Sequence, residues 1–126
     1  MKFKQIIGGT EEEAIARYPW LEGATFTDAV IDITGKYLVW KDGIWEDGTW
    51  IDGYWEGGHW IDGVWKGGVW EYGTWEGGTW EGGHWRGGFW EGGVWKGGLM
   101  WSNISQRLEK VVYKDGKFSI KEPNKK

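Results

Sequence analysis

The side chains that could do chemistry in this chain are carboxylates and two histidines spaced around a regular series of tryptophans. His59 and His84 each precede a tryptophan, and a glutamate follows many of the others. Paired carboxylates can act as general acid and base, and histidines with carboxylates can bind a metal ion. These glutamates are Glu46, Glu56, Glu71, Glu76, Glu81 and Glu91.

The surroundings of these side chains argue against both kinds of chemistry. Catalysis needs a concave, sheltered site, whereas the residues flanking each tryptophan are expected on flat or convex outer faces. His59 and His84 are expected on different faces. The glycine-rich stretch lacks the Lys-Ser/Thr end and the helix of a phosphate-binding loop. We therefore predict a protein that is not an enzyme, with no catalytic residue, metal or cofactor.

The elements that position these residues follow a five-residue repeat. Trp occurs at every fifth position from Trp40 to Trp95, and Met100 takes the next slot. Glycine stands two places before each slot from Gly43 to Gly98, which rules out a helix. Strand-forming residues precede most tryptophans, so each unit is predicted to be a short strand followed by a corner. The predicted structural core is Trp40, Trp45, Trp50, Trp55, Trp60, Trp65, Trp70, Trp75, Trp80, Trp85, Trp90, Trp95 and Met100.

Two all-β architectures satisfy this pattern. In a solenoid the chain turns the same way at every corner, and residues 20 apart stack about 4.8 Å from each other with every Trp inside. In an up-and-down ribbon each Gly-Gly or Asp-Gly pair reverses the chain, and the ribbon resembles MORN hairpin repeats. Burial favours the solenoid, because the ribbon would expose all the indoles on one face.

A family resemblance supports the solenoid. The segment 24–33, ATFTDAVIDI, resembles two units of the pentapeptide-repeat family, which places a small residue two positions before a large apolar one. This resemblance implies a right-handed four-sided β-helix with both residues inside. The tryptophan units are similar, with the large residue grown to Trp and the small one reduced to Gly, an exchange that roughly conserves interior volume.

The repeat and its flanks suggest four segments. Residues 1–20 are predicted to form a strand and helix cap, in which Thr10 and Glu13 make a capping box before a helix that ends ahead of Pro19. Residues 21–39 are expected to form a starter coil and residues 40–101 the Trp solenoid. Residues 102–126 are expected to form a hairpin around Asp115-Gly116 and a basic tail.

Composition bounds the setting of the protein. The 126 residues leave room for one domain, and the absence of cysteine excludes disulfides and thiolate chemistry. No long apolar run or signal peptide is evident, so a non-secreted protein, cytoplasmic or part of a virion, is expected with no membrane partner. The net charge of −4 divides into −2, −6 and +4 for residues 1–39, 40–101 and 102–126. Nucleic acid is not an expected partner.

A spacing of 20 also predicts which outer residues meet. Glu46 would stack with Lys66 and Arg86, and Glu56 with Glu76 and Lys96. The same spacing would bring aromatic and aliphatic side chains together on one outer face, which would be less polar than the others. Its candidate contact residues are Ile51, Val69, Tyr72 and Phe89.

These observations lead to a structural hypothesis. The chain is expected to be a rigid Trp-cored tower that serves as spacer, cap or decoration in an assembly with protein partners. Its repeat resembles Trp- and Gly-rich proteins of phage virions. Two alternatives are a glycan-binding module, which needs an exposed Trp array, and an acidic DNA mimic like the pentapeptide-repeat inhibitors of DNA gyrase.

Overall fold

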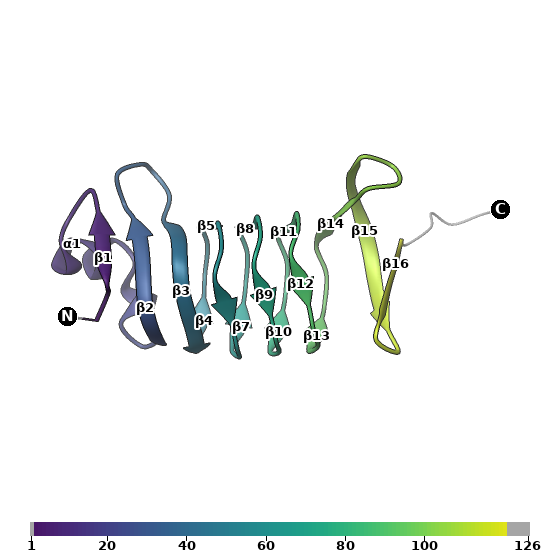
Figure 1. Cartoon of the computed structure of the whole chain (residues 1–126), viewed down its shortest axis with the longest axis horizontal. Coiled ribbons are helices and arrows are strands. Elements are labelled where there is room, and N and C mark those ends of the chain that lie inside the picture. The colour runs from purple at the N-terminus through teal and green to yellow at the C-terminus, as the bar shows by residue number, and fades with distance from the viewer. Residues whose placement is uncertain (1, 121–126) are drawn as a thin grey trace.

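A computed structural model describes residues 2–120 of the chain. The molecule is an elongated β-solenoid of about four turns, with different elements at its two ends (Figure 1). In chain order the elements before the repeat are β1 Gln5–Ile7, α1 Glu11–Arg17, the 3-10 turn Pro19–Leu21 and β2 Thr25–Asp32. The repeat forms β3 Val39–Asp47, β4 Thr49–Trp50, β5 Tyr54–Trp55, β6 His59–Trp60, β7 Val64–Trp65, β8 Val69–Trp70, β9 Thr74–Trp75, β10 Thr79–Trp80, β11 His84–Trp85, β12 Phe89–Trp90 and β13 Val94–Trp95. The C-terminal elements are β14 Leu99–Ser102, β15 Arg107–Lys114 and β16 Lys117–Ile120.

The inward-facing solenoid is confirmed and the hairpin ribbon is wrong, but the coil has three sides, not four. Trp40 pairs in parallel register with Trp55, and Trp50 with Trp65, so one full turn spans three of the five-residue units. The first side runs from the start of β3 through β5, β8 and β11 to β14. The second runs from the end of β3 through β6 and β9 to β12, and the third from β4 to β13.

The backbone of successive turns is joined by a regular set of hydrogen bonds. Val64 N donates to Gly48 O at 2.9 Å and Lys66 N donates to Trp50 O at 2.8 Å, and this pair of bonds recurs from unit to unit. The glycine two places before each tryptophan forms the corner. Its φ lies between 100° and 129° from Gly43 to Gly98, a region that residues with a Cβ rarely adopt.

The interior is filled by three columns of stacked indoles. Within a column the ring planes lie 3–7° apart at centroid distances of 4.8–5.1 Å, as for Trp40 on Trp55 and Trp55 on Trp70. Successive tryptophans around a turn meet edge to face, at 5.8 Å and 74° for Trp50 and Trp55. Both are favourable aromatic geometries. Three rings that meet in this way fill the cross-section, which is why a fourth side is not needed.

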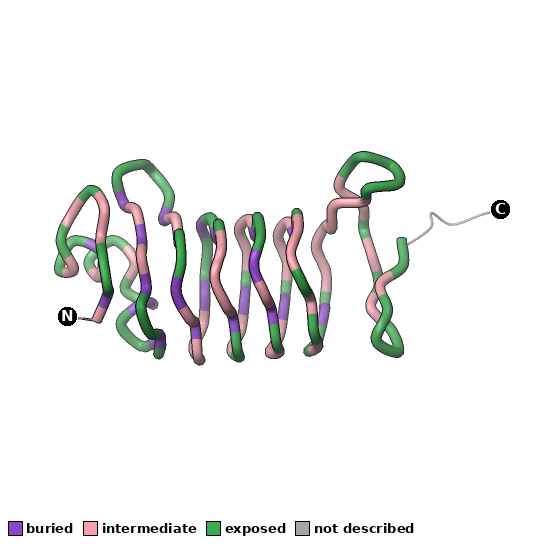
Figure 2. The backbone as a smooth tube through the Cα atoms, viewed as in Figure 1, coloured by how far each residue is buried: buried purple, intermediate pink, exposed green. Residues whose placement is uncertain are grey.

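Most of the predicted core tryptophans are fully enclosed. All from Trp40 to Trp80 are 0% exposed, Trp85 is 4% exposed and Trp95 is 9% exposed. Trp90 and Met100, at the C-terminal ends of their columns, are only half-buried. The core is thus closed toward the N-terminus and less complete toward the C-terminus (Figure 2).

Residues 21–39 do not form the expected starter coil. Their strand β2 runs antiparallel to β3, with Phe26 opposite Trp45 and Ile31 opposite Trp40. The register of β2 shifts between Thr27 and Val30, where Asp28 adopts a φ of 56°. The alternating apolar residues that resemble a repeat unit instead place Phe26 and Ile31 against the first indoles.

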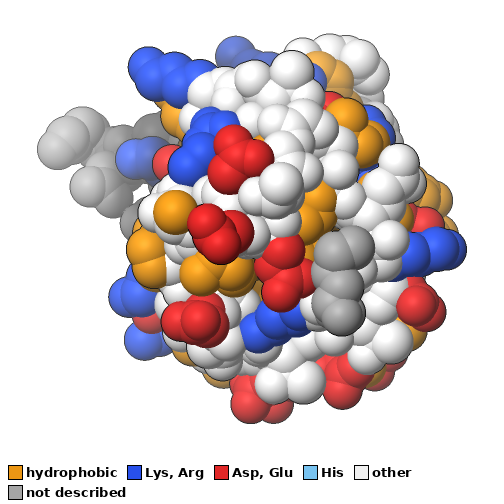
Figure 3. Space-filling view, turned by 90° about the vertical axis from the view of Figure 1, so that its left-hand side faces the viewer, with side chains coloured by type: hydrophobic (Ala, Val, Ile, Leu, Met, Phe, Trp, Pro, Cys, Tyr) orange, Lys and Arg blue, Asp and Glu red, His pale blue; other side chains and the backbone are white. Residues whose placement is uncertain are grey.

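The N-terminal cap packs closely on this antiparallel strand. Helix α1 begins with the predicted capping box, in which Glu13 N donates to Thr10 Oγ1 and Thr10 N donates to Glu13 Oε1. Strand β1 pairs with β2, and Trp20 packs 5.1 Å from Trp50, centroid to centroid. Acidic side chains gather near the middle of the outer surface of this cap (Figure 3).

The C-terminal end is partly covered by the predicted hairpin. Strand β15 pairs antiparallel with β14 and with β16, and the turn at Asp115 and Gly116 has φ values of 55° and 76°, the left-handed pair that such two-residue turns need. Phe118 packs edge-on against Trp90 and Trp95 at centroid distances of 5.3 and 5.2 Å. The basic tail predicted after this hairpin falls on residues 121–126, outside the described residues.

Candidate functional site

The outer surface of the coil is built from the residues directly before and after each tryptophan. A turn spans three units, so residues 20 apart do not stack and the two charge ladders expected at that spacing do not form. These were Glu46 with Lys66 and Arg86, and Glu56 with Glu76 and Lys96. Opposite charges meet between equivalent positions of neighbouring turns instead. These pairs are Lys41–Glu56 at 3.2 Å, Lys66–Glu81 at 3.5 Å and Glu71–Arg86 at 3.5 Å.

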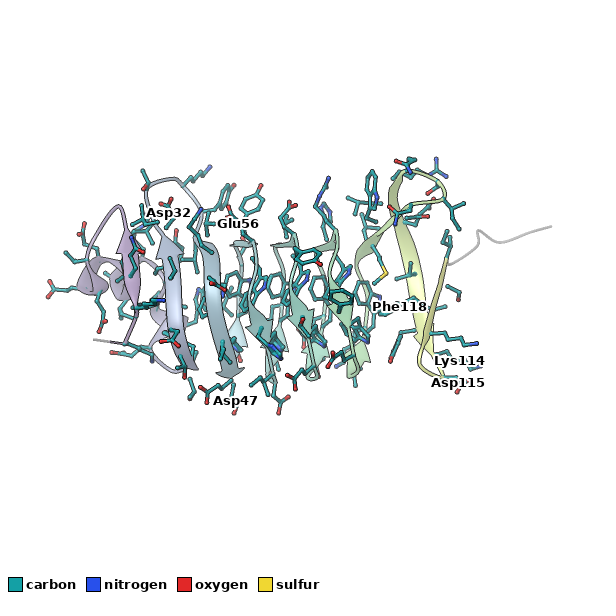
Figure 4. All side chains as sticks on the ribbon, viewed as in Figure 1. Asp32, Asp47, Glu56, Lys114, Asp115 and Phe118 are labelled. Atoms are coloured by element: carbon teal, nitrogen blue, oxygen red, sulfur yellow. The ribbon has the colours of Figure 1, made fainter. Side chains whose placement is uncertain are left out.

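All six of these side chains are substantially exposed, so each pair stabilises the fold by only about 0–1 kcal/mol. Glu56 and Glu71 follow Trp55 and Trp70 in neighbouring turns of one side. They do not pair with each other's partners, because Glu56 pairs with Lys41 of the preceding turn and Glu71 with Arg86 of the following turn. Glu56 is seen on the outside of the coil in Figure 4. The carboxylates therefore lie on an open outer surface and not in a sheltered site suited to acid–base chemistry.

The two histidines lie on different sides of the coil. His59 belongs to the side of β6 and pairs with Glu76 of the next turn, whereas His84 stands in register with Val69 and Leu99 on the side of β11. Within residues 2–120 no three histidine, aspartate or glutamate side chains are grouped so that they could hold a metal ion.

The four candidate contact residues are not gathered on one face. Val69 lies on the side of β8, and Ile51 follows β4 on the third side. Tyr72 and Phe89 do meet, with ring centroids 6.2 Å apart, and they are 56% and 60% exposed. The predicted contact face is therefore reduced to one exposed aromatic pair, because a three-sided turn sends Ile51 and Val69 elsewhere.

A second aromatic pair was not predicted from the sequence. Tyr37 and Tyr54 lie edge to face at 6.4 Å, beside a shallow hollow of about 230 Å³ that Asp52 and Val69 also line. Tyr37 precedes the repeat, so the five-residue pattern says nothing of its position. A turn of three units would have placed Tyr54 above Val39, close to Tyr37.

Several indole N–H groups end inside the coil without an acceptor. Trp50, Trp65 and Trp75 donate from Nε1 to the carbonyl oxygen 17 residues later, at 3.0–3.2 Å. The remaining buried indole nitrogens find no hydrogen-bond partner in the described chain. They are those of Trp40, Trp45, Trp55, Trp60, Trp70, Trp80, Trp90 and Trp95.

Comparison of the chain with known proteins identifies no relative. No protein-family model, no curated protein and no solved structure matches the chain. In the described part of the chain, no helix has the length and apolar character needed to cross a membrane.

Proposed function

We propose that this protein is a non-enzymatic structural module, a short rigid tower that acts as a spacer, cap or decoration within a larger protein assembly, such as a phage virion. The observation that supports it is the continuous indole core, which runs through the coil from the N-terminal cap to the C-terminal hairpin. A module of this kind needs stiffness along its axis more than it needs a pocket.

The physical basis of that stiffness is the dense contact between neighbouring turns. Each indole within the columns stacks on those above and below and meets its two neighbours in the turn edge to face. Each aromatic pair stabilises by about 0.5–1.5 kcal/mol beyond the burial of its apolar area. Bending the tower would open these stacks on one side, so the axis resists bending.

The relation that we propose to pentapeptide-repeat proteins is limited to the pattern of the repeat unit. Both use a five-residue unit with a large inward side chain and a small residue two places before it. The three-sided turn departs from the four-sided coil of that family. The DNA mimicry of the gyrase inhibitors is not carried over, because lysine and arginine on the sides of the coil pair with its glutamates.

The proposal does not extend to glycan binding. That alternative required an exposed tryptophan array, whereas the indoles of the coil are enclosed. A structural role in an assembly is the function that the fold supports best.

Insertion of whole repeat units tests the spacer role. Duplicating residues 64–78 adds one turn, lengthens the tower by about 4.8 Å and leaves the two ends in the same relative orientation. Duplicating residues 74–78 adds one side and turns the C-terminal end by a third of a turn. Both insertions preserve the Trp period, so both chains are expected to fold.

The readout is incorporation of each chain into particles or complexes isolated from the native host. A spacer held at both ends should tolerate the insertion of a whole turn much better than that of a single side, whereas a cap or decoration held at one end should tolerate both. The proposal is overturned if the wild-type chain sediments as a free monomer in native extracts and its deletion leaves every assembly unchanged.

A further inference from the structure

The two ends of the solenoid are closed to different degrees. The N-terminal cap contributes fully buried side chains such as Leu21 and Ile31, whereas none of residues 96–120 is buried. In Figure 2 the C-terminal hairpin carries only intermediate and exposed colours. Apolar surface is therefore left open at the C-terminal end.

A hollow lies within this open end. It measures about 470 Å³ and is lined by Met100 and Trp101 of β14, by Ile104, and by Val111 and Ile120 of the hairpin. Ile104 is 93% exposed and Ile120 is 42% exposed. Exposed aliphatic groups around an apolar hollow characterise a binding surface.

A free strand edge borders the same hollow. Strand β16 is the last strand of its sheet, and among residues 2–120 nothing pairs with its outer edge. In an antiparallel pair, every second N–H and C=O of an edge strand points away from its partner. These groups can receive an extended segment of another chain as an added strand.

The charge of the hairpin selects the kind of segment. Residues 107–120 carry four basic and two acidic side chains, and Glu109 is paired with Arg107 at 2.9 Å. The other basic side chains, Lys110, Lys114 and Lys117, outnumber the one remaining acidic side chain of this segment, Asp115. The body of the coil is acidic, so an acidic segment is repelled by the sides and attracted to this end. Figure 4 shows Lys114 and Asp115 at the tip of the hairpin, away from the coil.

A second copy of this chain fits the edge poorly. Residues 107–120 carry a net positive charge, so two copies of this hairpin side by side would repel each other. The N-terminal cap is acidic on its outer surface (Figure 3) but, within residues 2–36, offers no exposed large hydrophobic side chain to fill the hollow. A segment of a different protein can pair with the free edge of β16, fill the apolar hollow and complement the positive charge of the hairpin.

We propose that the outer edge of β16 binds an extended, acidic segment of a partner protein, whose alternate aliphatic side chains fill the hollow between β14 and the hairpin. This inference rests on the proposed structural function, because it names the end of the tower that docks in the assembly. The hairpin lysines pair with the acidic side chains, and the edge of β16 supplies backbone hydrogen bonds.

The probe for this site is a blocked ten-residue peptide of alternating Glu and Val, added to the intact protein. Binding should protect amides of Phe118 to Ile120 from hydrogen exchange and should weaken with salt. The double variant Lys114→Glu/Lys117→Glu should bind at least about tenfold more weakly, because it replaces two attractive charge contacts with repulsive ones. Ile104→Ser should also weaken binding, and its side chain is too exposed to carry the fold.

Matched controls separate this site from other surfaces. Lys36→Glu, Ile51→Ser and Phe89→Ser make similar changes elsewhere and should leave affinity unchanged. A Lys-Val peptide should not bind, and a Glu-Val peptide methylated at alternate backbone nitrogens should lose most of its affinity. The proposal fails if no binding is seen at 10⁻³ M peptide, roughly the weak limit of useful affinities, if the methylated peptide binds equally, or if Lys36→Glu weakens binding as much as the double variant.

Incorporation into native assemblies separates this proposal from the structural function itself. If the wild-type chain incorporates and the Lys114→Glu/Lys117→Glu variant does not, the docking site and the structural function are both supported. If both chains incorporate equally, the docking site is wrong although the structural function holds. A wild-type chain that joins no assembly defeats the structural function, and concentration-dependent dimerisation abolished by the double variant would show that a second copy occupies the edge.

Discussion

At the scale of the residue, the two small positions of each unit have different physical roles. At the position two places before Trp, a Cβ would lie 2.2–2.8 Å from backbone of the neighbouring turn or strand, as at Gly83, where it would meet Gly68 O at 2.4 Å. At several corners it would also lie 3.0–3.3 Å from a buried indole nitrogen. The position two places after Trp has more space, and Asp or Tyr occupies it in several units.

Gly82 and Gly83 therefore form a matched pair for substitution by alanine. Gly83→Ala forces a φ of 103° on a residue with a Cβ, at a cost of about 1–3 kcal/mol, and adds the clash with Gly68 O. Gly82→Ala meets only Lys66 O at 3.5 Å and is expected to be neutral or to stabilise by about 0.4–1 kcal/mol. Urea denaturation of both variants measures the difference, and equal midpoints would contradict the corner geometry.

The acid sensitivity of the fold is also set by individual side chains. Hydrogen bonds from Thr34 hold the pKa of Asp32 below its ordinary value of 3.8, and Thr34 N donates to Asp32 Oδ1 at 2.8 Å. A carboxylate whose folded pKa is lowered contributes stability above its unfolded pKa and loses it as the pH falls through the folded value. Asp32 lies at the end of β2, before the loop to β3 (Figure 4).

Asp32→Asn is therefore expected to reduce the dependence of stability on pH below about 4, where an unperturbed aspartate titrates. The difference in thermal midpoint between wild type and variant should be largest at neutral pH and should shrink as the medium is made strongly acidic. A difference that is constant over this range would show that the charge of Asp32 has no part in holding the loop.

At the scale of the element, the sequence predicts the individual repeat units better than it predicts how many of them complete one turn of the coil. The five-residue period, the inward tryptophans, the capping box and the Asp115-Gly116 hairpin all follow from local rules. The number of sides does not, because it depends on the angle at each glycine corner and on how many indoles fill one layer. The resemblance of segment 24–33 to a repeat unit was misleading for a related reason: alternating apolar residues suit a coil and an antiparallel strand equally well.

The candidate site depended on the number of sides and was predicted less well. Tyr72 and Phe89 are still neighbours in a three-sided turn, whereas Ile51 and Val69 move to other sides. The open edge of β16 and the hollow beside it arise from tertiary packing of the hairpin. No residue pattern in the hairpin alone reveals how much of the last turn it covers.

The hairpin cap can be tested through Phe118. Truncation in Phe118→Ala removes the ring that covers Trp90 and Trp95, while the hairpin retains its turn and its pairing with β14. The expected cost is about 3 kcal/mol or less, since the site is only half-buried. Acrylamide should quench a larger fraction of the Trp fluorescence than in wild type, and unchanged quenching would mean that Phe118 does not shield the core.

At the scale of the whole molecule, the solenoid is a one-dimensional structure in which each turn contacts its neighbours. Stability in such a fold is close to a sum of turn and interface terms, so the terminal turns are the first to open. The weakly covered C-terminal end should open before the N-terminal cap. Hydrogen exchange should accordingly be fastest in β12 to β16 and slowest in β5 to β9, and uniform exchange along the coil would contradict this order.

The parallel indoles of each column also make the molecule an ordered array of chromophores. Their planes differ by 3–7° within a column, whereas successive rings around a turn are inclined by 69–76°. Excitation that passes along a column keeps its polarisation, and excitation that crosses to the next column loses it. Fluorescence in a rigid glass should therefore be far less polarised than that of an isolated tryptophan, and a single oxidised indole should dim the emission of many neighbours at once.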